Sequence, residues 1–114
     1  LAGATSDPSC GPVVVVGAGG IYAETLTDTA CRLAPFDEQT ALEMIAELKC
    51  SAILRGARGQ PPLDIGAVAK VLATLSQFVW DQRETVAEVD INPLCALRSG
   101  AIAADALVVR RNPQ

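Results

Sequence analysis

Two runs of the chain repeat their apolar residues with the period of an α-helix. Residues 38–49 place apolar side chains on one side of such a helix and Glu43 and Glu47 on the other. The first apolar stripe consists of Ala41, Leu42, Ile45 and Leu48. Residues 65–80 carry a second stripe of Val68, Val71, Leu72, Leu75 and Val79, with Phe78 and Trp80 near its end. Asp37 and Asp64 precede the two runs, so each is expected to cap the N-terminus of an amphipathic helix that packs on a core.

The shorter apolar segments read as strands. Val13–Val16 is an uninterrupted β-branched run, which is typical of a buried strand. Ile21–Thr25 and Thr29–Leu33 are further candidates, and residues 1–11 resemble an extended segment that runs into a turn.

Near the C-terminal end, polar and apolar residues alternate strictly. Residues 86–97 are predicted to form one strand, Arg98-Ser99-Gly100 a turn, and residues 101–109 a strand that returns antiparallel. Glu88, Asp90 and Asn92 then point to one face. A turn of three to four residues places Asp105 opposite Asn92 or Pro93.

These four side chains are hard oxygen donors, which Mg²⁺ prefers. Successive outward residues of a strand are about 6.6 Å apart, so a single ion could bind neighbouring pairs but not all four. The alternative is a solvent-exposed strand face that happens to be acidic.

The pattern predicts an α+β fold in which residues 1–114 form a single domain. A mostly antiparallel sheet of about five strands should carry the two helices on one face. Glu88, Asp90, Asn92 and Asp105 should occupy the other face.

Composition excludes several classes of function. The net charge is −4 and the basic residues are scattered, which argues against nucleic-acid binding. The mean hydropathy is +0.31, yet no apolar run approaches the roughly 20 residues that span a membrane. The chain has no His, and its four Cys form no Cys-x-x-Cys pair, so we expect no zinc site and a cytoplasmic protein with free thiols.

Two loops invite a nucleotide-binding interpretation. Gly17–Gly20 follows a strand, but Tyr22 replaces the third Gly of a dinucleotide fingerprint and no P-loop Lys follows, so a tight turn is the alternative. Arg58 lies between glycines and could contact an anion, or it could be a solvated loop residue. Arg32 is a lone cation in an apolar strand, so it either forms a salt bridge or points into a cleft.

Four motifs in order resemble the ATP-grasp domain of ADP-forming (NDP-forming) acyl-CoA synthetases. The family includes ADP-forming acetate–CoA ligases and related protein lysine acetyltransferases, and it is related to the β subunit of succinyl-CoA synthetase. The motifs are Gly11 to Glu24, Arg32 to Pro35, Arg58 to Asp64 and Glu88 to Leu94.

The resemblance implies that ATP or ADP is bound with Mg²⁺ between two subdomains. The implied reaction is reversible and converts acyl-CoA, ADP and phosphate to acid, ATP and CoA. Asp90 and Asn92 match the family's metal motif, and Asp105 stands where a second metal-binding Asp is expected. Arg58 and, less directly, Arg32 would contact phosphates, with Glu88 as a carboxylate lining the cleft.

Some family parts are missing. The other ATP-grasp half and the relay His are not found, and the chain begins at Leu1 rather than Met. We therefore expect an excised C-terminal subdomain that is inactive alone. Its partners would be the remaining ATP-grasp half and CoA-binding domains or a subunit, and a homodimer of the fragment is possible.

Two alternatives stay open. The chain could be a degenerate, non-catalytic ATP-grasp module with a role in assembly or regulation, or it could belong to a lysine acetyltransferase. A Rossmann-like dinucleotide binder fits poorly, because too few strands and helices alternate.

Overall fold

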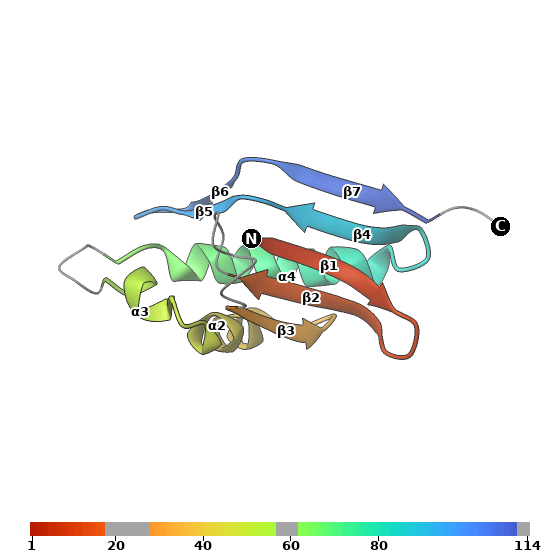
Figure 1. The fold of residues 1–114 in the computed structure, drawn as a ribbon, viewed down its shortest axis with the longest axis horizontal. Helices are drawn as coiled ribbons and strands as arrows, with labels where there is room; N and C mark the ends of the chain where they lie inside the picture. Colours follow the sequence, from red (N-terminus) through yellow and green to blue (C-terminus); the bar gives the residue numbers. More distant parts are fainter. Residues whose placement is uncertain (18–27, 57–61, 112–114) are drawn as a thin grey trace.

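Five antiparallel strands form the main sheet, in the order β3-β2-β1-β4-β7 (Figure 1). This arrangement is seen in a computed structural model of the chain, which describes residues 1–17, 28–56 and 62–111. The strands are β1 (Ala2–Asp7), β2 (Gly11–Gly17), β3 (Thr29–Leu33), β4 (Val86–Ile91) and β7 (Ala106–Arg110). The predicted α+β class and mostly antiparallel sheet are confirmed.

The N-terminal segment lies at the centre of this sheet. Strand β1 pairs with β2 through a tight hairpin and with β4 on its other side. Its small residues Ala2 and Ala4 are buried beneath the helices, so the backbone there can approach the helical layer closely. The sequence indicated an extended segment here, and the structure adds its position between the adjacent strand β2 and the distant strand β4.

The C-terminal hairpin is interrupted where the sequence predicts two continuous strands. Past Ile91 the chain forms a separate two-stranded sheet of β5 (Leu94–Ala96) and β6 (Ala101–Ala103) before β7 begins. The prediction of unbroken strands over 86–97 and 101–109 is therefore wrong. Pro93 lies at the break and lacks the N–H that a continuous ladder would use.

Both predicted helices are present, with small differences at their ends. They are α2 (Glu38–Glu47) and α4 (Ile65–Asp81), and the helical turn α3 (Ser51–Leu54) lies between them. The predicted caps are confirmed: a carboxylate oxygen of Asp37 accepts a hydrogen bond from the backbone N–H of Thr40, at 2.9 Å. Asp64 accepts one from Ala67, also at 2.9 Å. Helix α2 ends before residue 49, because the backbone of Leu48 is extended.

The core lies between the helices and one face of the sheet. The largest fully buried side chains include Met44, Ile45, Leu72 and Val14. Two predicted core residues are exposed to solvent: Leu42 is 36% exposed and Phe78 is 41% exposed. Because α4 covers the middle of the sheet and leaves β7 open, the side of α4 that carries Phe78 faces a cleft instead of a packed layer.

Two buried polar side chains join segments that are distant in sequence. The hydroxyl of Ser76 on α4 donates to the carbonyl oxygen of Phe36 and accepts from the N–H of Phe36, both at 3.1 Å. The carboxylate of Asp28 accepts hydrogen bonds from the N–H groups of Lys49 and Cys50, at 2.6 and 3.0 Å. These contacts fix the loops that enter and leave α2 against the rest of the core.

Some predicted features fall on residues that the structure does not describe. The candidate strand Ile21–Thr25, most of the Gly17–Gly20 turn and the loop position Arg58 fall outside the described residues. Among the helices of the described residues, none is both long and apolar enough to cross a membrane.

Candidate metal and phosphate site

The acidic side chains of β4 lie on the face of the sheet that no described helix covers. Glu88 and Asp90 are exposed, whereas Val89 between them is 5% exposed and packs toward the helices. This separation follows from the alternation of side chains along a strand, which the sequence pattern predicted. The helix-free face therefore presents a row of carboxylates, as expected.

Asn92 and Asp105 are brought together at the junction of the two sheets. The pairs Ile91–Ala106 and Leu94–Ala103 flank them in register. The backbone N–H of Asn92 donates to the carbonyl oxygen of Asp105 at 3.1 Å, and the N–H of Ala104 donates to the carbonyl oxygen of Pro93 at 3.0 Å. Of the two predicted registers, the structure has the one that places Asp105 opposite Asn92.

The space beside Asp90 is kept open by a glycine. Gly3 of β1 is the cross-strand partner of Asp90, and it contributes no side chain to the helix-free face. A Cβ atom at this position would lie 3.1 Å from the carbonyl oxygen of Val89, so even a methyl group would crowd the neighbouring strand. On the other side of Asp90 lies Leu107 of β7. One flank of this carboxylate is thus bare backbone and the other is apolar.

The donor set fits a magnesium ion that is bound partly by its substrate. Among the described residues, no three His, Cys, Asp or Glu side chains gather closely enough to enclose a metal. Asp90 and Asp105 are two exposed carboxylates, and the nearby Asn92 adds a carboxamide oxygen. Mg²⁺ is usually held by one or two carboxylates together with phosphate oxygens and water, so this sparse set of hard donors is suitable.

Glu88 is further from the junction than Asp90. It is paired across the sheet with Thr5 of β1 and Val109 of β7, and it lies one outward position along β4 from Asp90. About 6.6 Å separates such positions, so Glu88 borders the site without joining the Asn92–Asp105 pair.

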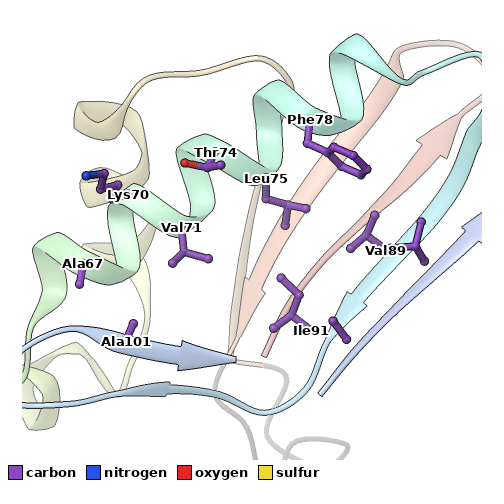
Figure 2. A pocket seen from close by; sticks show the side chains of 11 residues that line it. Ala67, Lys70, Val71, Thr74, Leu75, Phe78, Val89, Ile91 and Ala101 are labelled. Carbon is purple, nitrogen blue, oxygen red and sulfur yellow. The ribbon is translucent and has the colours of Figure 1, made fainter. Parts of the chain in front are cut away.

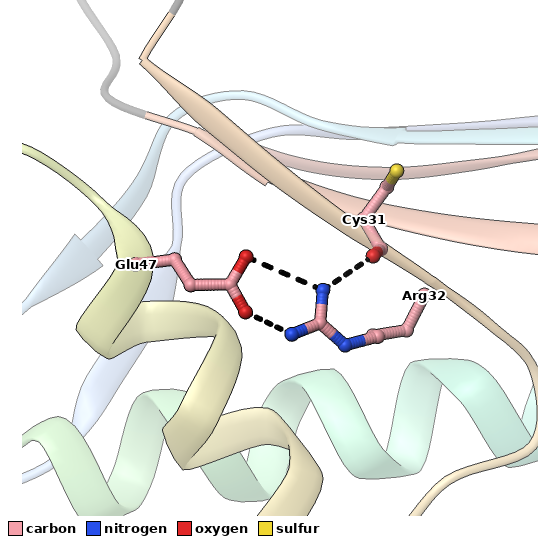
Figure 3. Close-up of polar contacts among 3 residues, drawn as sticks. All are labelled: Cys31, Arg32 and Glu47. Atoms are coloured by element: carbon pink, nitrogen blue, oxygen red, sulfur yellow. Dashed lines mark hydrogen bonds and ion pairs between the residues drawn. The ribbon is translucent and has the colours of Figure 1, made fainter.

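Arg32 is not brought to this site. It is the cross-strand partner of the buried Val14, which places it on the helix-covered face. Its guanidinium forms an ion pair with Glu47 of α2 and donates to the carbonyl oxygen of Cys31 at 2.8 Å (Figure 3). The hydrogen bond with Glu47 raises the pKa of Arg32. Of the two alternatives for this residue, the structure has the salt bridge.

A large cleft among the described residues also lies away from the acidic row. It has a volume of about 640 Å³ and separates α4 from the edge of the sheet (Figure 2). Leu75 and Phe78 line it from the helix, and Val89 and Ile91 line it from β4. Its walls are almost wholly apolar, and Lys70 is the charged residue among those that line it. This chemistry does not suit phosphates, so the cleft is separate from the candidate site.

Comparison with known proteins identifies the family of this chain. The sequence profile of the ATP-grasp domain matches residues 1–109. The chain belongs to the ATP-grasp family. It is 41% identical over 109 residues to the β subunit of ADP-forming acetate–CoA ligase I of Pyrococcus furiosus. That match covers 96% of this chain and 47% of the relative, so the chain spans about half the length of that subunit. ADP-forming acetate–CoA ligase I of Archaeoglobus fulgidus is also 41% identical, over 105 residues that are 92% of this chain and 15% of the relative.

Solved structures share the fold of this chain, and one of them is an acetyl-coenzyme A synthetase. The chain superposes with a TM-score of 0.90 and 37% identity on acetyl-coenzyme A synthetase 1 of Ca. Korarchaeum cryptofilum, in complex with coenzyme A and Mg-AMPPCP. The match covers 96% of this chain and 51% of that one. A protein from Pyrococcus horikoshii gives a TM-score of 0.93 at 35% identity, covering 98% of this chain and 48% of that one. The resemblance to ADP-forming acyl-CoA synthetases is therefore confirmed.

Proposed function

We propose that this chain is the C-terminal ATP-grasp subdomain of an ADP-forming acyl-CoA synthetase, and that it helps to hold Mg²⁺ on the phosphates of ATP. The full protein would interconvert acyl-CoA, ADP and phosphate with acid, ATP and CoA. Asp90, Asn92 and Asp105 would contribute oxygen ligands. The relative that was solved with Mg-AMPPCP supports a nucleotide and a divalent metal as the ligands.

One observation carries this proposal. Asn92 lies between β4 and β5 and Asp105 lies between β6 and β7, yet their backbones are hydrogen-bonded to each other close to Asp90, which is exposed on the helix-free face. A strand that only needed to be soluble would not require this juxtaposition of three oxygen-bearing side chains. The alternation along β4 and the hairpin register produce it together.

Each residue of the proposed site would have its own role in binding the ion and the phosphates. Asp90 and Asp105 supply negative charge to attract the cation, and Asn92 supplies a neutral oxygen donor. A bound Mg²⁺ would neutralise charge on the phosphate oxygens. Glu88 would limit how closely the phosphates approach along β4, since it repels them. Arg58, which lies outside the described residues, is proposed to contact the phosphates from the loop before α4.

Exposed apolar side chains on the helix-free face support the proposal that another part of the protein packs there. Leu107 is 59% exposed, Val109 39% and Leu33 54%, and all three lie on the same face as Asp90. Apolar side chains grouped on one face commonly mark an interface. We propose that the remaining ATP-grasp half covers this face and closes over the nucleotide, with the CoA-binding domains or subunit beyond it.

Two further features of the proposal concern the fragment's surroundings. Exposed free thiols at Cys10, Cys31 and Cys95 fit a reducing compartment such as the cytoplasm. All five residues of the edge strand β7 are exposed, so the fragment alone could pair through this edge into a homodimer. Light scattering on the 114-residue chain would distinguish a monomer from such a dimer.

The test of the function uses the full-length protein that contains this chain. Asn92→Ala should reduce nucleotide-dependent acyl-CoA turnover by at least about 100-fold, because a ligand to the ion is lost. Glu84→Gln is the matched control, since Glu84 is an exposed polar residue in the turn before β4. Unchanged turnover in Asn92→Ala would contradict the metal role and favour the non-catalytic module. Transfer of an acetyl group to protein lysines would instead favour the acetyltransferase.

A further inference from the structure

Asp64 forms more hydrogen bonds than a helix cap requires. One carboxylate oxygen accepts from the N–H of Ala67 at 2.9 Å, which is the ordinary capping contact. The other accepts from the N–H of Gly100 at 2.7 Å, across 36 positions of sequence. The backbone N–H of Asp64 also donates to the carbonyl oxygen of Leu97 at 2.6 Å. The first residue before α4 therefore contacts both sides of the β5–β6 turn.

That turn belongs to a hairpin that would otherwise be weakly held. Strands β5 and β6 have three residues each and form a two-stranded sheet of their own beyond the main sheet (Figure 1). A two-stranded hairpin is marginally stable by itself in water. Asn92 and Asp105 stand at its base, with the main sheet on one side and the hairpin on the other. Movement of the hairpin would therefore change their relative position.

Apolar packing also holds the hairpin against the core, but hydrophobic contacts do not impose one orientation on it. Leu94, Ala96 and Ala101 are partly buried against the core. Burial of this kind scales with area and tolerates small rotations. The hydrogen bonds of Asp64 are directional, and one of them is made by a charged acceptor, which is the stronger kind. They fix the orientation of the turn relative to α4.

We propose that Asp64 is a positioning residue for the Asn92–Asp105 pair, which acts by anchoring the β5–β6 turn to the start of α4. This inference rests on the proposed function, since it assigns the pair to the metal. Main-sheet pairing at Ile91–Ala106 fixes the base of the hairpin, and Asp64 fixes its tip. The oxygen atoms of Asn92 and Asp105 then keep one relative placement before any ion binds.

Asp37 provides a natural comparison. It caps α2 through the N–H of Thr40, and within the described part of the chain its side chain makes no second contact like that of Asp64 with Gly100. The pKa of each carboxyl is lowered, that of Asp37 chiefly by the N–H of Thr40 and that of Asp64 chiefly by the N–H of Gly100. Both residues therefore cap a helix, but Asp64 also anchors the β5–β6 turn.

The test therefore pairs Asp64→Ser with Asp37→Ser. Serine is as good a cap as aspartate, but its short hydroxyl cannot cap Ala67 and reach Gly100 together. In the 114-residue chain, amide exchange of the hairpin residues 94–103 should accelerate about tenfold in Asp64→Ser and stay unchanged in Asp37→Ser. Equal exchange in the hairpin of both variants would overturn the anchor.

The functional part is measured in the full-length protein. Asp64→Ser should raise the Mg²⁺ concentration for half-maximal nucleotide-dependent turnover about threefold to tenfold, with the rate at saturating Mg²⁺ within about twofold of wild type. Asp37→Ser should leave both quantities unchanged. An unchanged Mg²⁺ requirement in Asp64→Ser, alongside a raised one in Asn92→Ala, would overturn the positioning role alone. An unchanged requirement in Asn92→Ala would overturn the proposed function, and the exchange result would still decide whether the anchor exists.

Discussion

The backbone N–H of Asn92 lies 3.1 Å from the carbonyl oxygen of Asp105, to which it donates a hydrogen bond. The two residues come from opposite arms of one hairpin, and their side chains stand where the main sheet meets the small one. This contact converts two separated sequence motifs into one candidate site.

The isolated chain should bind Mg·ATP weakly. It presents one open face of the candidate site, and the match to relatives covers about half of their length. Isothermal titration calorimetry of the 114-residue chain should give a dissociation constant well above the micromolar range. Micromolar or tighter binding by the chain alone would contradict the proposal that the chain carries only half of the Mg·ATP site.

Removing the charge of Arg32 should leave nucleotide binding unchanged, whereas removing the charge of Asp105 should weaken metal binding. Arg32→Gln removes an exposed ion pair with Glu47 on the helix-covered face, so nucleotide KM in the full-length protein should stay within about twofold. Asp105→Asn removes a charge beside Asn92 and should raise the Mg²⁺ requirement about tenfold or more. A loss of nucleotide affinity in Arg32→Gln would return this residue to the phosphate site, where the sequence resemblance placed it.

Ser76 should matter for stability. Its buried hydroxyl accepts a hydrogen bond from the N–H of Phe36, and the carbonyl oxygens of Phe36 and Ala73, at 3.1 and 2.8 Å, share its single hydrogen. Ser76→Ala leaves the N–H of Phe36 without this acceptor, so the free energy of unfolding should fall by about 1–3 kcal/mol in urea denaturation. Ser9→Ala, at an exposed turn position, serves as the control and should be close to neutral. Equal stability of Ser76→Ala and wild type would show that water replaces the hydroxyl.

Acid should weaken the fold partly through Asp64. The N–H groups of Gly100 and Ala67 stabilise the charged carboxylate, so its pKa is lower in the folded chain than in the unfolded one. A lowered folded pKa contributes stability that is full above the unfolded pKa of about 3.9 and is lost as pH falls through the folded pKa. The urea midpoint of wild type should therefore fall between about pH 5 and pH 2, and Asp64→Ser should lose less over the same window. An identical pH dependence of the two proteins would contradict this role of Asp64.

The sequence predicted the local features well, because periodicity and turn length determine them. The helical stripes located α2 and α4, and both caps were identified from Asp37 and Asp64. The hairpin turn limited the register to two choices, one of which is observed. Local patterns therefore located the candidate site itself.

Long-range contacts could not be predicted in this way. No local pattern indicates that Asp28 accepts hydrogen bonds from Lys49 and Cys50, or that Asp64 contacts Gly100. The exposure of Phe78 likewise depends on how far α4 covers the sheet. Such features depend on the packing of whole elements, so sequence spacing alone leaves them undetermined.

The metal role of Asp90, Asn92 and Asp105 is tested most directly by a paramagnetic ion in place of magnesium. The 114-residue chain, labelled with ¹⁵N, would be titrated with Mn²⁺ and ATP while amide resonances are followed by NMR. Resonances of residues 90, 92 and 105 should broaden first, because relaxation by the ion falls steeply with distance. Broadening that begins instead around Glu43 and Glu47 of α2, with these three unaffected, would contradict the proposed site.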